Sequence, residues 1–138
     1  IDVVHRWNCK MALDDYGAGY SSEGMLLQFE PDIVKMDLML VRGIQNDEKQ
    51  KMIAQNLISY CHPQNILVLA EGVETQEELA CLMELGVDLF QGYYLARPSL
   101  ELPSIDQEVV REMQEYGKAA TYYSMYQGRI PFVTNLIK

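Results

Sequence analysis

Four short apolar runs alternate with longer segments of helical pattern, and this alternation restricts the fold more than any other feature of the chain. The runs cover residues 10–13, 31–37, 66–70 and 87–90. A repeated order of strand and helix predicts parallel strands that are joined by crossover helices. We therefore expect an α/β fold of parallel β/α units. Four such units form half of a TIM-like (β/α)8 barrel.

Helix signals follow the strand-like runs. Thr75 and Glu78 have the spacing of a capping box, and Gly86 suits the left-handed residue that ends a helix. Asp47 marks the start of another helix. Its expected apolar stripe consists of Ile53, Leu57, Ile58 and Cys61. A further helix near the C-terminus is expected over residues 104–117.

The charge of the chain excludes several classes of partner. Its 20 acidic residues outnumber 11 basic ones, so the formal net charge is −9. A surface this acidic is unsuited to binding duplex DNA, bulk RNA or an anionic membrane. An anionic substrate can bind where a metal ion inverts the local field. No apolar run approaches the roughly 18 residues of a membrane span.

The cysteines and the first residues bear on where the protein works. Cys9, Cys61 and Cys81 are odd in number and form no Cys-x-x-Cys pair. We therefore expect reduced, mostly buried thiols in a cytoplasmic protein. The sequence opens inside an apolar, helix-like stretch without an initiating methionine. This start leads us to expect a piece of a longer protein.

A polar residue that can take part in chemistry ends or follows each strand-like run: Asp14, Lys35, Glu71 and Gln91. The carboxyl ends of the strands in a β/α barrel share one face, so these side chains are expected to meet there. Asp14 and its neighbour Asp15 offer two hard oxygen donors that suit Mg²⁺ or Mn²⁺. The alternative for this pair is a capped turn whose carboxylates satisfy loop amides.

Structural explanations compete with functional ones at several positions. Lys35 is expected either to orient a water or a phosphate oxygen, or to pair at the surface with Asp32 or Asp37. Glu74 precedes a capped helix, where the helix dipole favours a carboxylate regardless of function. Tyr94 either stacks on a base or forms part of the wall of the domain.

Four motifs, read in order, resemble one known family. They are Asp-Asp-Tyr-Gly-Ala-Gly-Tyr-Ser-Ser at 14–22, Val-Lys-Met-Asp at 34–37, Ala-Glu-Gly-Val-Glu-Thr at 70–75, and Gln-Gly-Tyr-Tyr with Arg-Pro within 91–98. This series is similar to the later half of the EAL domain, the family of cyclic di-GMP phosphodiesterases. The resemblance implies that residues 1–117 are the C-terminal half of an EAL domain and supply the second half of its barrel. Residues 118–138 are expected to be a tail of unknown role.

The resemblance also implies a role for each matching residue. Asp14, Asp15 and Glu71 are the expected ligands of two Mg²⁺ or Mn²⁺ ions, with Asp14 bridging the pair. Lys35 and Glu71 are the expected catalytic residues, and Lys35 would hold or help to deprotonate the attacking water. The remaining assignments are loop or site support by Glu74 and Gln91, and substrate binding by Gln91, Tyr94 and Pro98.

The activity implied by the resemblance is hydrolysis of cyclic di-GMP to linear pGpG. The Glu-Ala-Leu signature of the family, and three ligands of the first metal, would precede Ile1, so the chain alone is expected to be inactive. The alternative is a non-catalytic module for cyclic di-GMP binding or dimerisation. A homodimer is expected because half a barrel leaves open sheet edges. An upstream sensory or GGDEF domain is compatible with the sequence.

Overall fold

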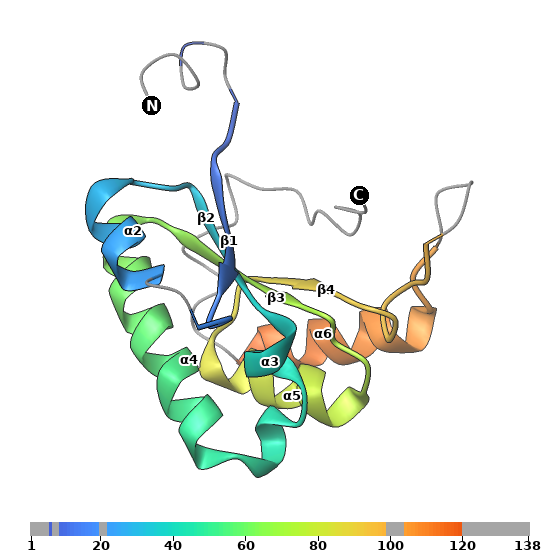
Figure 1. Cartoon of the computed structure of the whole chain (residues 1–138). Helices are drawn as coiled ribbons and strands as arrows, with labels where there is room; N and C mark the ends of the chain where they lie inside the picture. The colour runs from blue at the N-terminus through green and yellow to red at the C-terminus, as the bar shows by residue number, and fades with distance from the viewer. Residues whose placement is uncertain (1–5, 7–8, 20–21, 99–103, 120–138) are drawn as a thin grey trace.

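The protein is built around a four-stranded parallel sheet (Figure 1). The computed structural model describes residues 6, 9–19, 22–98 and 104–119. The strands are β1 (Ala12–Tyr16), β2 (Ile33–Met36), β3 (Leu67–Glu71) and β4 (Leu89–Gln91), and they lie in the order of the sequence. All three strand pairings are parallel, so the predicted β/α arrangement is confirmed.

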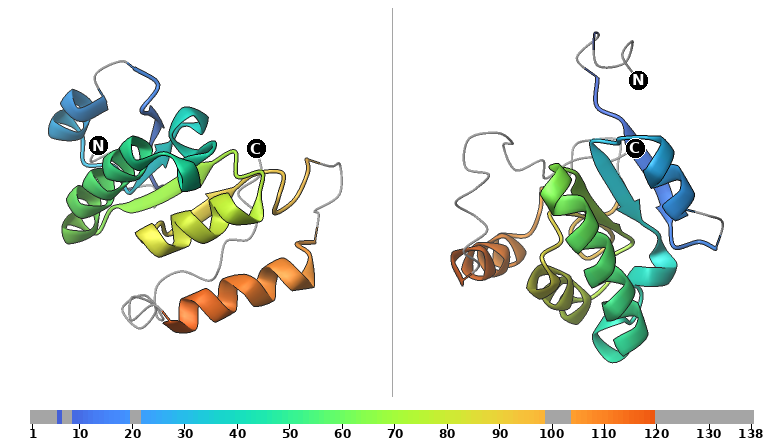
Figure 2. Two further views of the ribbon diagram at one scale, coloured as in Figure 1. Left: turned by 90° about the horizontal axis from the view of Figure 1, so that it is seen from below. Right: turned by 90° about the vertical axis from the view of Figure 1, so that its left-hand side faces the viewer.

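Helical segments connect the strands. The helices are α2 (Ser22–Gln28), α3 (Leu38–Val41), α4 (Glu48–Cys61), α5 (Gln76–Leu85) and α6 (Gln107–Ala119), with short 3₁₀ turns η1 (Ile44–Asn46) and η2 (His62–Gln64). Helices α4, α5 and α6 follow one another along one side of the sheet, with α5 packed against both neighbours (Figure 2). The expected C-terminal helix is thus present as α6.

The two faces of the sheet differ in what they bury. Val34, Met36, Val68 and Ala70 are fully buried in the core with apolar residues of α4 and α5. Successive residues of a strand point to opposite faces. The intervening Lys35 therefore lies on the other face, at the strand ends that carry the candidate site.

Capping chemistry sets the bounds of the two longest crossover helices. The side chain of Asp47 accepts hydrogen bonds from the first turn of α4. Thr75 and Glu78 form the predicted capping box of α5, and Gly86 ends that helix in the left-handed conformation. Both predicted helix starts are therefore confirmed, because a side-chain acceptor satisfies amides that have no partner within the helix.

The predicted stripe of α4 is wrong at one position. Ile53 is 43% exposed, and Ala54 is buried in its place. The buried residues at 54, 57, 58 and 61 have helical spacing. Only the first of them differs from the predicted stripe, by one position. Ala54 is small, so an apolar pattern weighted by side-chain size favours its larger neighbour Ile53 instead.

Two further expectations meet the structure only in part. Cys61 is buried, Cys81 is half-buried and Cys9 is exposed, so the prediction of mostly buried thiols is wrong for Cys9. Burial raises the pKa of Cys61 to about 12, which makes that thiol inert. The helix-like start of the chain and most of the tail at 118–138 lie outside the described residues. Within the described part of the chain, no helix has both the length and the apolar character needed to cross a membrane.

Candidate metal centre

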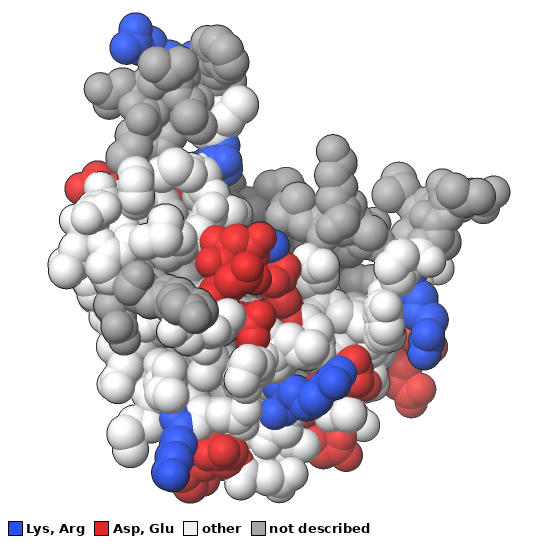
Figure 3. All heavy atoms as spheres, viewed as in Figure 1, with Lys and Arg blue, Asp and Glu red and all other residues white. Residues whose placement is uncertain are grey.

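Three carboxylates and one ammonium meet at the carboxyl ends of the strands. One carboxylate oxygen each from Asp14, Asp15 and Glu71 lies within 4.8 Å of the others. Lys35 Nζ lies 2.9 Å from Asp14 Oδ1 and 2.7 Å from Glu71 Oε1. A group of acidic side chains occupies the middle of the same face, with a small basic area beside it (Figure 3). The four residues therefore converge from β1, β2 and β3, as expected.

An irregularity in β1 brings two adjacent carboxylates to one point. Neighbouring residues in a regular strand point to opposite faces. Here the register with β2 shifts between Leu13 and Tyr16, and Asp15 adopts a left-handed backbone with φ of 56°. The Asp15 amide donates a 3.1 Å hydrogen bond to Asp14 Oδ1. Aspartate tolerates this conformation better than most residues, so the strained backbone places a second ligand in the cluster.

The turn after Asp15 requires a glycine. Gly17 has φ of 104°, and a Cβ atom there would lie 2.4 Å from Leu40 Cδ1. The backbone N–H of Ala18 closes the turn by donating to the carbonyl of Asp15. The glycine therefore lets the chain turn tightly against α3 immediately after the two aspartates.

The charges of the cluster reinforce each other. Burial by itself lowers the pKa of Lys35, but hydrogen bonds and charge attraction from Glu71 and Asp14 outweigh it and raise that pKa above its usual range. The hydrogen bond from Lys35 lowers the pKa of Asp14. Lys35 is therefore an ammonium whose positive charge is held between carboxylates.

The donor set fits a divalent cation. Three negative charges against one positive charge leave an excess of two negative charges at the cluster. Carboxylate oxygens are the ligands that Mg²⁺ and Mn²⁺ prefer. The alternative pairing of Lys35 with Asp32 or Asp37 is wrong, because the ion pairs of Lys35 are with Asp14 and Glu71.

Gln91 and Glu74 flank the cluster. Gln91 lies opposite Glu71 in the register of β3 and β4, and its carbonyl accepts a 3.0 Å hydrogen bond from the amide of Val73. The carboxylate of Glu74 forms an ion pair with Arg42. Both residues thus border the loop that follows β3. Their support of the site stays a prediction.

The two expected substrate-binding residues farther along the chain lie in different settings. The Tyr94 hydroxyl donates a 3.2 Å hydrogen bond to Glu112 of α6, and its ring packs against the core. Burial and the charge of Glu112 raise the pKa of this hydroxyl. Pro98 is exposed and follows Arg97, whose guanidinium lies 5.0 Å from the ring centre of Tyr93. Substrate contacts of Tyr94 and Pro98 stay predictions.

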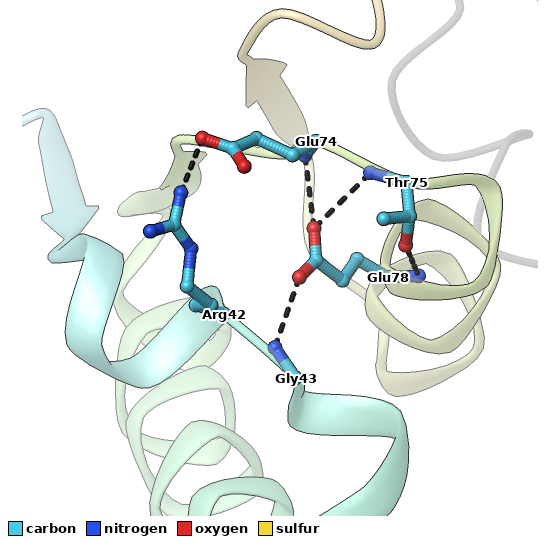
Figure 4. A network of polar contacts seen from close by, with 5 residues as sticks. All are labelled: Arg42, Gly43, Glu74, Thr75 and Glu78. Atoms are coloured by element: carbon cyan, nitrogen blue, oxygen red, sulfur yellow. Dashed lines mark hydrogen bonds and ion pairs between the residues drawn. The ribbon is translucent and has the colours of Figure 1, made fainter.

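Sequence reasoning missed one polar network beside the site (Figure 4). The buried carboxylate of Glu78 joins the capping box of α5 to the backbone of Gly43, which follows α3. The spacing of Thr75 and Glu78 indicated the capping box. Nothing in the local sequence indicated Gly43, because the two residues are 35 positions apart.

Comparison with known proteins places this geometry in a family. The EAL domain model matches residues 1–98. The chain is 35% identical over 98 residues to the probable cyclic di-GMP phosphodiesterase PdeA of Escherichia coli, an alignment that covers 71% of this chain and 13% of that protein. Over the three curated relatives with these matches, the chain spans less than a third of each protein's length.

Solved structures agree with the sequence match. The crystal structure of a standalone EAL protein from Vibrio cholerae, bound to cyclic di-GMP, matches with a TM-score of 0.75 and 39% identity over 80% of this chain and 47% of that one. Klebsiella pneumoniae BlrP1, in complex with manganese and cyclic di-GMP, matches with a TM-score of 0.67 and 40% identity over 70% of this chain and 25% of that one. The four parallel strands and the acidic cluster at their carboxyl ends agree with these matches. The chain therefore belongs to the EAL domain family.

Proposed function

We propose that this chain is the C-terminal part of a metal-dependent phosphodiesterase that hydrolyses cyclic di-GMP to linear pGpG. The main support is the convergence of three carboxylate oxygens within 4.8 Å, with Lys35 bridging two of the carboxylates. The names of the relatives support the substrate, because they are cyclic di-GMP phosphodiesterases.

Each residue of the cluster has a distinct proposed task. Asp14, Asp15 and Glu71 hold divalent cations, Mg²⁺ or Mn²⁺. A bound metal of this kind makes the phosphorus more electrophilic and lowers the pKa of a water ligand. Lys35 donates hydrogen bonds to the water or to a phosphate oxygen, because its ammonium carries protons to donate. Gln91, opposite Glu71 in the sheet, supports the position of that ligand.

We assign the activity to the longer protein rather than to these residues alone. The family resemblance places the remaining ligands of the first metal before Ile1. Without them, the cluster of Asp14, Asp15 and Glu71 forms part of a two-metal site, and the 138 residues alone are expected to be inactive.

Homodimerisation and a cytoplasmic location complete the proposal. Three apolar side chains on successive helices are strongly exposed: Leu27 of α2 at 82%, Met39 of α3 at 70% and Met52 of α4 at 61%. Exposed apolar side chains of this kind favour a protein–protein contact. The reduced thiols of Cys61 and Cys81 support a reducing compartment, the cytoplasm.

The deciding experiment measures hydrolysis by the full-length protein with Mg²⁺ or Mn²⁺, and chromatography separates cyclic di-GMP from pGpG. Asp14→Asn is expected to abolish turnover because it removes one ligand charge. The matched control is Asp106→Asn, which changes the same functional group beside α6. Undiminished hydrolysis by Asp14→Asn would remove that residue from the metal centre. Tight binding of cyclic di-GMP without hydrolysis by the unmodified protein would favour the non-catalytic alternative.

A further inference from the structure

Glu78 is a buried carboxylate in the first turn of α5. Its exposed fraction is 3%, and it is the single charged residue in the buried class among the described residues. Burial of a charged group is costly unless hydrogen bonds satisfy it. Glu78 meets this condition with hydrogen bonds from three backbone amides, so its position is determined by more than the capping of its own helix.

The three amides come from two separate segments. Glu78 Oε2 accepts from the amides of Glu74 at 2.8 Å and Thr75 at 3.2 Å, whereas Oε1 accepts from the amide of Gly43 at 2.9 Å. Figure 4 shows the carboxylate between these segments, with the ion pair of Arg42 and Glu74 alongside. One side chain therefore joins the β2–α4 connection to the β3–α5 connection.

Each of the two joined segments follows a strand that carries a residue of the candidate site: Lys35 on β2 and Glu71 on β3. Three residues separate the ligand Glu71 from Thr75, and the middle one, Val73, is fully buried with its amide bound to the carbonyl of Gln91. On the other side, α3 starts directly after β2, which carries Lys35. A shift of one connection relative to the other would therefore move Glu71 relative to Lys35.

A second contact stiffens the β2–α4 connection. The side-chain amide of Gln50, on α4, donates to the carbonyls of Met39 at 2.7 Å and Arg42 at 3.1 Å. These carbonyls lie at the C-terminal end of α3, where no partner exists within the helix. The segment that Glu78 holds is therefore itself fastened to α4, so the bond to Gly43 has a rigid anchor.

We propose that Glu78 is a positioning residue of the metal centre: its carboxylate locks the loop after β3 onto the turn after α3 and so sets the place of Glu71 beside Lys35. This inference rests on the proposed function, because it assigns Glu71 to the metal. It predicts that loss of the bond to Gly43 weakens the binding of metal even when α5 stays folded.

The chemistry of the side chain allows a sharp test. A carboxylate accepts hydrogen bonds on both oxygens, whereas glutamine has one oxygen and a donating amide. In Glu78→Gln, the remaining side-chain oxygen can still accept hydrogen bonds from the amides of Glu74 and Thr75. The side-chain NH2 group then faces the N–H of Gly43, and two donors cannot form a hydrogen bond. The variant thus keeps the cap of α5 and breaks the link between the two connections.

The experiment measures the affinity of the full-length protein for Mn²⁺ by calorimetry, well below the melting temperature, together with kcat and KM for cyclic di-GMP. For Glu78→Gln we expect about tenfold weaker Mn²⁺ binding, the size of effect seen when support of a metal ligand is lost. We also expect a lower kcat with little change in KM. The charge-matched control, Glu77→Gln in the same turn, is exposed and should change neither value.

Thr75→Ala separates positioning from stability. It removes the hydroxyl that accepts from the Glu78 amide but leaves the three bonds to the Glu78 carboxylate. It should lower the melting temperature while leaving Mn²⁺ affinity unchanged. If Glu78→Gln lowers the melting temperature but binds Mn²⁺ as tightly as the unmodified protein, Glu78 is only a helix cap and the proposal is wrong.

Arg42→Gln keeps the test decisive if Glu78→Gln does not fold. This variant breaks the exposed ion pair between Arg42 and Glu74, which is a second link between the same two connections. We expect a loss of Mn²⁺ affinity that is smaller than the loss in Glu78→Gln. Unchanged affinity in that variant would overturn the proposal. Absence of Mn²⁺ binding or hydrolysis in the unmodified protein would instead contradict the proposed function, so the two failures are distinguishable.

Discussion

The carboxylates at the two ends of the parallel sheet differ in exposure and in the direction of their pKa shift. At the carboxyl ends, Asp14 is 61% exposed, and the hydrogen bond from Lys35 lowers its pKa. At the amino ends, Asp88 is 15% exposed next to His62, and burial raises its pKa in spite of the hydrogen bonds that it accepts. The first carboxylate is available to a cation, whereas the second is enclosed by protein.

The buried end uses its charge to join elements. Asp88 Oδ2 accepts a 2.8 Å hydrogen bond from the amide of Val68 and lies 3.1 Å from His62 Nε2. These contacts connect the start of β4 to β3 and to the turn after α4. The exposed end instead gathers more negative charge than it neutralises. On the proposed function, stability and ligand binding are thus separated along the strands, the division expected of a β/α barrel.

The largest expected effect is at the exposed end. Lys35→Met removes the ammonium between Asp14 and Glu71 while keeping much of the apolar stem. We expect kcat of the full-length protein to fall about 100-fold or more, the range for loss of a group that handles protons or water. Lys51→Met is the control, because Lys51 pairs with Glu48 on α4. An equal loss in both variants would show that the effect is not specific to the site.

A substitution at the amino ends of the strands should lower the free energy of unfolding without changing metal affinity. Asp88→Ala leaves the amide of Val68 without its side-chain acceptor, which costs about 1–3 kcal/mol of unfolding free energy. Denaturant unfolding of the full-length protein measures this loss, and calorimetry with Mn²⁺ should give an unchanged affinity. Weaker Mn²⁺ binding in Asp88→Ala would mean that the two ends are coupled.

Paired glycine variants test the turn that carries the two aspartates. Gly17→Ala meets both a left-handed backbone and a contact of 2.4 Å with Leu40, whereas Gly19→Ala has the same kind of backbone in open space. We expect Gly19→Ala to cost about 1 kcal/mol of unfolding free energy, and Gly17→Ala to cost about 1–2 kcal/mol more because of the overlap. Equal melting temperatures would show that Leu40 moves aside freely.

The smallest effect is a pair of opposite pH trends. The lowered pKa of Asp14 stabilises the fold above the unfolded-state pKa, and this contribution disappears as the pH falls through the folded-state value. The raised pKa of Asp88 has the reverse sign: its contribution is present at low pH and is lost as the pH rises through the folded-state value.

Urea unfolding between about pH 6 and pH 3 can separate the two trends. Relative to the unmodified protein, Asp14→Asn should lose less stability on acidification, and Asp88→Asn should lose more. The same trend in both variants would contradict the contrast between the two ends of the sheet.

Periodicity and residue type were enough to predict much of this molecule. Short apolar runs between helical segments predicted the parallel strands, and the polar residues at their ends predicted the cluster of Asp14, Lys35 and Glu71. The capping box of Thr75 and Glu78 was equally local. These features depend on residues close in sequence or on a rule that all parallel strands obey, so no long-range detail was needed.

Other features depend on contacts between distant segments. Three such features arise when separate connections pack together. They are the left-handed backbone of Asp15, the choice of Asp14 and Glu71 as the partners of Lys35, and the hydrogen bond from Gly43 to Glu78. The exposure of Ile53 has the same origin, since the packing of α4 against its neighbouring elements decides which side of the helix is buried. Residue order alone therefore specifies which groups reach the strand ends, and three-dimensional packing specifies which of them touch.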